Sequence, residues 1–363
     1  MKELLAAVAI AIAGALALVA SIVAANRTTS ASNTPAAAAE QSGMSGMTVA
    51  AGATAPGISY AGTTVDNADA LAKARTPYPA ALPPVPAGNL VKVRMVLKDV
   101  TIQIAPGIKY AAWGFQGGAP GPIVHVRQGQ TVQMTLTNGG AIPHSIDFHA
   151  ARIAPNKAFV DVDPGKSLTF RFTANDPGVF MYHCGTKPVL AHIANGMYGA
   201  IVVDPKTPLA PAAKSYVLVA SEWYLNAPGT GRPAQLDMGK ARAVQPDWTT
   251  FNGYARQYVD HPLTANPGDL VRFYVVDAGP SLTTAFHIVG TILNKVYPDG
   301  DMTAGHELTG IQTFDVPAGG GAVFEVKIDQ PGLYPFVSHS FASVDMGQVG
   351  LLKVGNVPGT MSH

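Results

Sequence analysis

A short stretch at residues 181–197, MYHCGTKPVLAHIANGM, gathers the residue types that bind transition metals. It contains the only cysteine of the chain, Cys184, next to His183, and His192 and Met197 follow. One thiolate, two imidazoles and a weak thioether ligand form the set that holds copper in electron-transfer sites. Cys184, His192 and Met197 would supply three of these four ligands, so the second imidazole has to come from another segment.

The segment PHSIDFH at residues 143–149 offers two candidates for that imidazole, His144 and His149. Successive side chains of a strand leave opposite faces of the sheet. His183 and Cys184 therefore cannot serve the same site, and neither can His144 and His149, which are five residues apart. We predict one site that joins His144 to the three ligands of the first stretch, and a second site that joins His149 to His183. The 183–184 peptide bond would then be a short covalent path for an electron.

The chain also contains an internal repeat that suggests a third ligand for the second site. The order TVQMTLTN, DFH, VDPGKSLTFRF and DPGVFMYHC returns as LVRFYVVDAGP, AFH, VPAGGGAVFEVKI and QPGLYPFVSHS. This alignment places His183 and Cys184 opposite His339 and Ser340, so only the first half has the thiol. His339 is the candidate third ligand, and three histidines around copper with an open position would suit a catalytic metal.

Hydrophobic periodicity predicts an all-β fold for both halves. Apolar residues alternate with polar ones, as in Val132, Met134 and Leu136, and clusters such as GGAPGP and NDPG between these runs favour turns. No long amphipathic helix interrupts the pattern. We expect two tandem Greek-key β-sandwich domains at residues 88–205 and 215–357, joined by a linker at 206–214.

The N-terminal part has the composition of an export signal followed by a tether. Lys2 precedes an uncharged apolar run from Leu4 to Ala25, which suits either a cleaved signal peptide or an uncleaved membrane anchor over residues 1–26. Residues 27–87 are rich in Ala, Ser, Thr, Gly and Pro and predict a flexible tether. The protein is expected to be exported, in the periplasm or at the outer face of the cytoplasmic membrane. The formal net charge of +1 gives no reason to expect a nucleic-acid partner.

These motifs closely resemble those of the copper-containing nitrite reductases, two-domain cupredoxin proteins related to the multicopper oxidases. The resemblance runs roughly from Val91 to Gly355. It is carried, in the family's order, by IAPGIKYAAWGFQGGAPGPIVHVRQG, PHSIDFH, PGVFMYHCGTKPVLAHIANGMYGAIVV, GPSLTTAFHIVG, KVYPDG, VPAGG and LYPFVSHS.

The resemblance implies two copper ions per chain and a role for each candidate residue. The expected ligands are His144, Cys184, His192 and Met197 for type 1 copper, and His149, His183 and His339 for type 2 copper. Asp147 and His287 match the family's catalytic pair. The expected reaction is the one-electron reduction of nitrite to nitric oxide, with a small cupredoxin or a cytochrome c as electron donor.

The resemblance further implies a homotrimer in which His339 of one subunit completes the type 2 site of the next. Two local features differ from the usual family sequence. Val289 stands where isoleucine is common, and the segment SFASVDMGQVG after His339 is shorter.

Two other functions are compatible with parts of this pattern. A laccase-like multicopper oxidase would need four HxH histidine pairs, and the ten histidines of the chain form none. A copper protein that only transfers electrons would need the type 1 site alone. The number of copper ions per chain distinguishes this carrier from the two-site enzyme.

Overall fold

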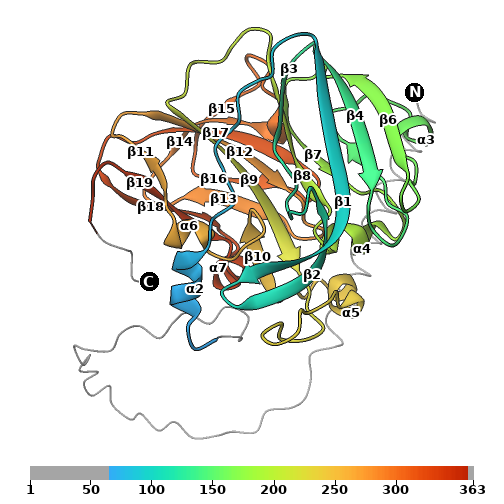
Figure 1. Cartoon of the computed structure of the whole chain (residues 1–363). Coiled ribbons are helices and arrows are strands. Elements are labelled where there is room, and N and C mark those ends of the chain that lie inside the picture. Colours follow the sequence, from blue (N-terminus) through green and yellow to red (C-terminus); the bar gives the residue numbers. More distant parts are fainter. Residues whose placement is uncertain (1–64, 359–363) are drawn as a thin grey trace, which may run out of the picture. The chain divides into compact units, whose positions relative to one another are not determined.

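The first half of the protein forms a β-sandwich of two four-stranded sheets, shown in teal and green in Figure 1. The computed structural model describes residues 65–358. One sheet has the order β2-β1-β4-β6 and the other β3-β8-β7-β5. The strands are β1 (Leu90–Ala105), β2 (Ile108–Phe115), β3 (Val124–Arg127), β4 (Thr131–Asn138), β5 (Asp147–Phe148), β6 (Ser167–Thr173), β7 (Gly178–His183) and β8 (Tyr198–Asp204).

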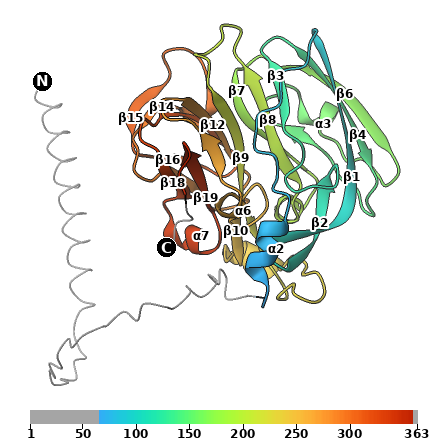
Figure 2. The same ribbon diagram turned by 60° about the vertical axis from the view of Figure 1, so that its left-hand side comes forward.

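The second half forms a larger sandwich from a six-stranded and a five-stranded sheet (Figure 2). Their orders are β10-β9-β12-β17-β14-β15 and β11-β19-β18-β13-β16. The strands are β9 (Lys214–Trp223), β10 (Trp248–Phe251), β11 (Leu263–Ala265), β12 (Leu270–Asp277), β13 (Thr284–Ile288), β14 (Leu293–Tyr297), β15 (Leu308–Ile311), β16 (Thr313–Val316), β17 (Gly321–Lys327), β18 (Gly332–Ser338) and β19 (Val349–Val354). The predicted all-β fold is therefore confirmed.

Helices are short and lie between strands. They are α2 (Ala68–Ala74), α3 (Pro155–Ala158), α4 (Val189–Ala194), α5 (Met238–Ala243), α6 (Gln257–Asp260), α7 (Phe341–Asp345) and the 3₁₀ turn η1 (Pro298–Gly300). Within residues 65–358, none of these helices has the length and apolar character needed to cross a bilayer. The predicted signal or anchor, residues 1–26, lies outside the described part of the chain.

Apolar cores lie within each sandwich and between the two sandwiches. Each sandwich has its own core between its sheets, and β4 alternates between buried and half-buried residues as its sequence predicts. A third core joins β7 and β8 of the first sandwich to β9, β12 and β17 of the second, through residues such as Val179, Val202 and Val217. Because β8 and β9 have apolar neighbours on both faces, nearly all of their residues are buried. This core holds in place the strands that carry the metal-ligand candidates.

The last part of the predicted tether is packed against the sandwiches rather than free. Residues 68–74 form α2, and Gln257 accepts hydrogen bonds from the Arg75 guanidinium (2.9 Å) and the Tyr78 amide (2.8 Å). Val217 of β9 donates its amide to the Ala80 carbonyl at 2.7 Å. The sequence pattern did not indicate this, because the partners lie far along the chain. Residues 27–64 of the predicted tether lie outside the described residues.

Candidate metal centres

Strands β5 and β7 place the first-half candidates next to one another. They pair antiparallel with Asp147 opposite His183, and the His149 amide donates to the Met181 carbonyl at 3.0 Å. After β7 the chain runs through α4, which carries His192. Gly196, with φ +102°, then turns the chain back into β8. A residue with a side chain would be strained at that φ.

His144, Cys184 and His192 form a buried cluster of potential ligand atoms. The Cys184 Sγ lies 3.2 Å from His192 Nδ1 and 4.0 Å from His144 Nδ1, and the two Nδ1 atoms are 3.1 Å apart. The three residues are 0%, 0% and 2% exposed. Met197 is buried in the same core as Cys184, and its carbonyl accepts a hydrogen bond from the Cys184 amide at 3.1 Å.

The donor set and the electrostatics of this cluster fit a copper ion. Burial lowers the pKa of His144 to about 4, helped by the neighbouring His192, and burial also lowers the pKa of His192. Both imidazoles are therefore neutral at neutral pH and have a lone pair available. The Ser145 amide donates to the Cys184 sulfur at 3.3 Å, which stabilises a thiolate. Two imidazoles and one thiolate without a carboxylate favour copper over hard cations.

Asp147, His149 and His183 form a second, more open cluster on the other side of the 183–184 peptide bond. Their ligand atoms lie within 4.8 Å of one another, and His149 is exposed while the other two are half-buried. Residues 183 and 184 thus belong to different clusters, joined by a single peptide bond. The predicted separation of these two neighbouring residues into different sites is therefore present in the structure.

Hydrogen bonds orient both rings of this second cluster toward a common point. His149 Nδ1 lies 3.0 Å from the Gly319 carbonyl and His183 Nδ1 lies 2.9 Å from the Cys184 carbonyl. A carbonyl only accepts, so each Nδ1 carries the hydrogen and each Nε2 keeps a lone pair. The two Nε2 atoms are 3.0 Å apart. Burial, as the largest effect, lowers the pKa of His183, so an extra proton between the rings is disfavoured. A metal ion bound between the two Nε2 atoms would relieve this lone-pair repulsion.

His287 and His339 lie together in the second sandwich, apart from both clusters. Their ring centroids are 5.3 Å apart, and the His287 Nδ1 donates to the Gln312 carbonyl at 2.6 Å. His339 is exposed and packs its ring against Phe341, whose own side chain is 56% exposed. Among residues 65–358, His339 does not join His149 and His183 within one chain. Within one chain, the described residues therefore do not form the expected tri-histidine site.

The structure also shows groups to which the sequence assigned no role. Trp113 contacts both buried histidines, with ring centroids 5.2 Å from His144 and 4.9 Å from His192. The carbonyls of Gly319 and Gln312 orient His149 and His287. Trp113 and Gly319 stand in quoted motifs, YAAWGFQGG and VPAGG, but sequence alone does not show which ring or which carbonyl they contact.

Comparisons with known proteins identify relatives of this chain. The profile of the multicopper oxidase family matches residues 97–208. The copper-containing nitrite reductase of Neisseria gonorrhoeae is 39% identical over 270 residues, which cover 73% of this chain and 68% of that relative. The copper-containing nitrite reductase of Alcaligenes faecalis is 28% identical over 289 residues, which cover 73% and 76%.

Solved structures of copper proteins are also similar to this chain. The copper nitrite reductase from Nitrosomonas europaea superimposes with a TM-score of 0.68 at 34% identity, covering 74% of this chain and 94% of that one. A multicopper oxidase crystal structure superimposes with a TM-score of 0.64 at 28% identity, covering 73% and 89%. With a relative 39% identical over most of both chains, the protein belongs to the family of copper-containing nitrite reductases.

Proposed function

We propose that this protein reduces nitrite to nitric oxide, using one electron and two protons and releasing water. The observation that carries the proposal is the pair of donor clusters joined by the peptide bond between His183 and Cys184. The type 1 ligands would be His144, Cys184, His192 and Met197, and the type 2 ligands His149, His183 and His339. Copper would supply a one-electron store at the first set and a Lewis acid at the second.

Asp147 and His287 are suited to handle the two protons. The Asp147 carboxylate lies beside His149 and His183, where it can accept a hydrogen bond from a protonated nitrite oxygen. Because the Nδ1–H of His287 is held by the Gln312 carbonyl, Nε2 is the atom free to take up and release a proton. The carbonyl bond also fixes the direction of that nitrogen.

The geometry supports a site shared between subunits, and the family resemblance implies that these subunits form a homotrimer. His149, His183 and Asp147 belong to the first sandwich, whereas His339 and His287 belong to the second and meet each other there. Exposure of His149 and His339 leaves both free to face another copy. Export through residues 1–26 and electron donation by a small cupredoxin or a cytochrome c complete the proposal.

Copper content and a reduced-sample assay test this function. We expect about two copper ions per chain, and nitrite-dependent release of nitric oxide from protein reduced by an artificial donor. Fully loaded protein that accepts electrons from the artificial donor but does not turn over nitrite would refute the function. About one copper per chain and no turnover would support the alternative, a type 1 electron-transfer protein, because His144, Cys184 and His192 already meet within one chain.

The shared site has its own test in mixed assemblies. His149→Ala and His339→Ala chains are each expected to be inactive alone. When the two are co-expressed, an interface between a His339→Ala chain supplying His149 and a His149→Ala chain supplying His339 regains both ligands. Recovered activity supports the intersubunit site. A mixture as inactive as its parents, in assemblies shown to contain both chains, would contradict it.

A further inference from the structure

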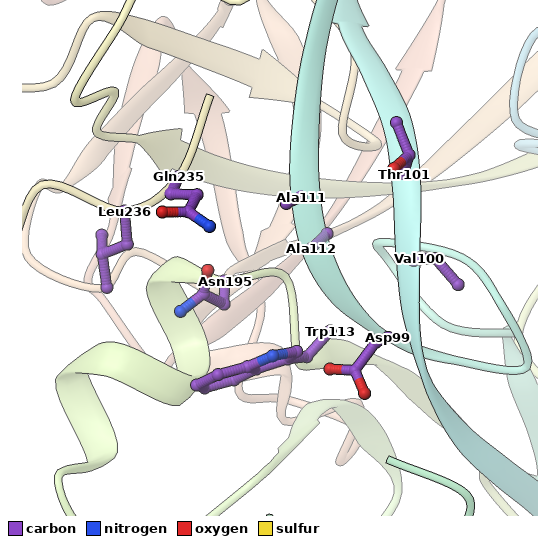
Figure 3. Close-up of a pocket in the computed structure, with 9 residues that line it drawn as sticks. All are labelled: Asp99, Val100, Thr101, Ala111, Ala112, Trp113, Asn195, Gln235 and Leu236. Atoms are coloured by element: carbon purple, nitrogen blue, oxygen red, sulfur yellow. The ribbon is translucent and has the colours of Figure 1, made fainter. Parts of the chain in front are cut away.

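A surface hollow of about 470 Å³ is lined in part by Trp113, whose ring contacts His144 and His192 of the buried cluster. Its walls come from β1, β2, the residue that ends α4, and residues 235–236 (Figure 3). Asp99 and Thr101 stand on β1, and Asn195 and Gln235 face them across the opening. The hollow is large enough for several water molecules or one small organic ligand.

Trp113 separates this hollow from the buried histidines. In Figure 3 its ring lies below Asn195 and beside Asp99. The same ring contacts His144 in a T-shaped arrangement and His192 in a tilted one. Those two histidines are only 0% and 2% exposed although the hollow lies just beyond Trp113.

A backbone hydrogen bond fixes the strand segment from which the indole projects, and ring contacts restrain the indole itself. The Trp113 amide donates to the Asn195 carbonyl at 2.9 Å, which ties β2 to the end of the helix that carries His192. A shift of the backbone at Trp113 would therefore need β2 and the end of α4 to move together. Its contacts on two different segments, His144 before β5 and His192 in α4, restrict rotation of both rings.

We propose that Trp113 is a positioning residue for the type 1 site, which it keeps dry and whose two histidine rings it holds in fixed orientation. This inference rests on the proposed function, because it presumes copper at the cluster of His144, Cys184 and His192. An apolar ring that excludes water destabilises the more highly charged, oxidised metal, and so raises the reduction potential. Fixed rings also determine the ligand geometry on which the visible absorption depends.

The test compares Trp113→Ala and Trp113→Phe with a matched control, Gln235→Ala. Gln235 lines the same hollow. Because its side chain has no aromatic ring, it cannot make the ring contacts with the histidines that Trp113 makes. For each copper-loaded variant, the visible spectrum, the type 1 reduction potential and the spectral response to added imidazole are measured. Imidazole is the probe because it fits the hollow and competes for a histidine position.

For Trp113→Ala we expect a lower potential, a shifted visible band and a saturable spectral change with imidazole. Trp113→Phe keeps an aromatic ring of smaller size, so its potential should fall less and its band should resemble the wild type. Gln235→Ala should match the wild type in all three measurements. If Trp113→Ala does not fold or load copper, the Trp113→Phe potential decides: a lowered value supports the inference and an unchanged value overturns it.

Two further results would overturn the inference. One is that both Trp113 variants have the same visible spectrum, reduction potential and imidazole response as the wild type. The other is a Gln235→Ala protein that changes as much as Trp113→Ala, which would assign the effect to the hollow rather than to the indole. Both differ from failure of the proposed function, which would appear as a wild-type protein without a type 1 band or without nitrite turnover.

Discussion

Asp277, at the end of β12, offers a quantitative test of how burial of a charge limits stability. The side chain is 2% exposed. Burial raises its pKa from 3.8 to about 7, and the buried Glu222 nearby adds to this. Hydrogen bonds from Thr284 and from the Gly279 amide, the latter at 2.8 Å, act in the opposite direction but do not offset the burial.

The raised pKa predicts the sign of the pH dependence. A native state with the higher pKa binds the proton more tightly than the unfolded chain does, so ionisation favours unfolding. The contribution of the protonated Asp277 is fully present below about pH 4 and is lost as the pH rises from about 4 to about 7. A change from 3.8 to about 7 corresponds to at most about 4 kcal/mol of unfolding free energy.

Asp277→Asn removes the ionisable group and keeps the shape of the side chain. We expect the variant to gain stability over the wild type as the pH is raised, with a difference of up to about 4 kcal/mol at pH 8 and little difference near pH 4. Urea unfolding followed by tryptophan fluorescence, with both proteins in the same metal-loaded state, measures this difference at each pH.

The exposed Asp329 provides the matched control for this experiment. Asp329→Asn should follow the wild type within about 0.5 kcal/mol throughout, as a surface substitution usually does. The reasoning about Asp277 is refuted if the stability difference between Asp277→Asn and the wild type does not change with pH, or if it grows as the pH is lowered.

Three other substitutions test separate parts of the structure. Cys184→Ala should abolish the visible type 1 absorption, and a variant that stays coloured would exclude the thiolate as ligand. His287→Ala should keep that absorption but slow nitrite turnover by about 10²- to 10⁴-fold, the usual contribution of a general acid or base; unchanged turnover would remove its role in proton transfer. Arg272→Met leaves the buried Glu325 carboxylate without the guanidinium that now pairs with it, which should lower the unfolding free energy by about 3–5 kcal/mol in urea titrations. Adding Glu325→Leu to that variant should restore most of the loss, and a double variant no more stable than Arg272→Met would argue against an uncompensated charge.

Local sequence pattern was enough to predict the all-β fold. The period of two in strands such as β4 is a property of the extended backbone itself, so it can be recognised without any tertiary contact. The same period predicted that His183 and Cys184 leave opposite faces. That prediction requires only that the two residues be neighbours on one strand. The structure places them in different clusters.

Only the tertiary structure decided which distant groups meet. The approach of Trp113 to His144 and His192, and of the Gly319 carbonyl to His149, depends on how separate segments pack, which no local period encodes. The packing of α2 and residues 75–80 against the second sandwich is of the same kind, because Gln257 lies about half the chain away. Turn-rich, Pro-rich composition indicates only that such a segment makes no sheet of its own, whereas its hydrogen-bond partners are set by the surface on which it lies.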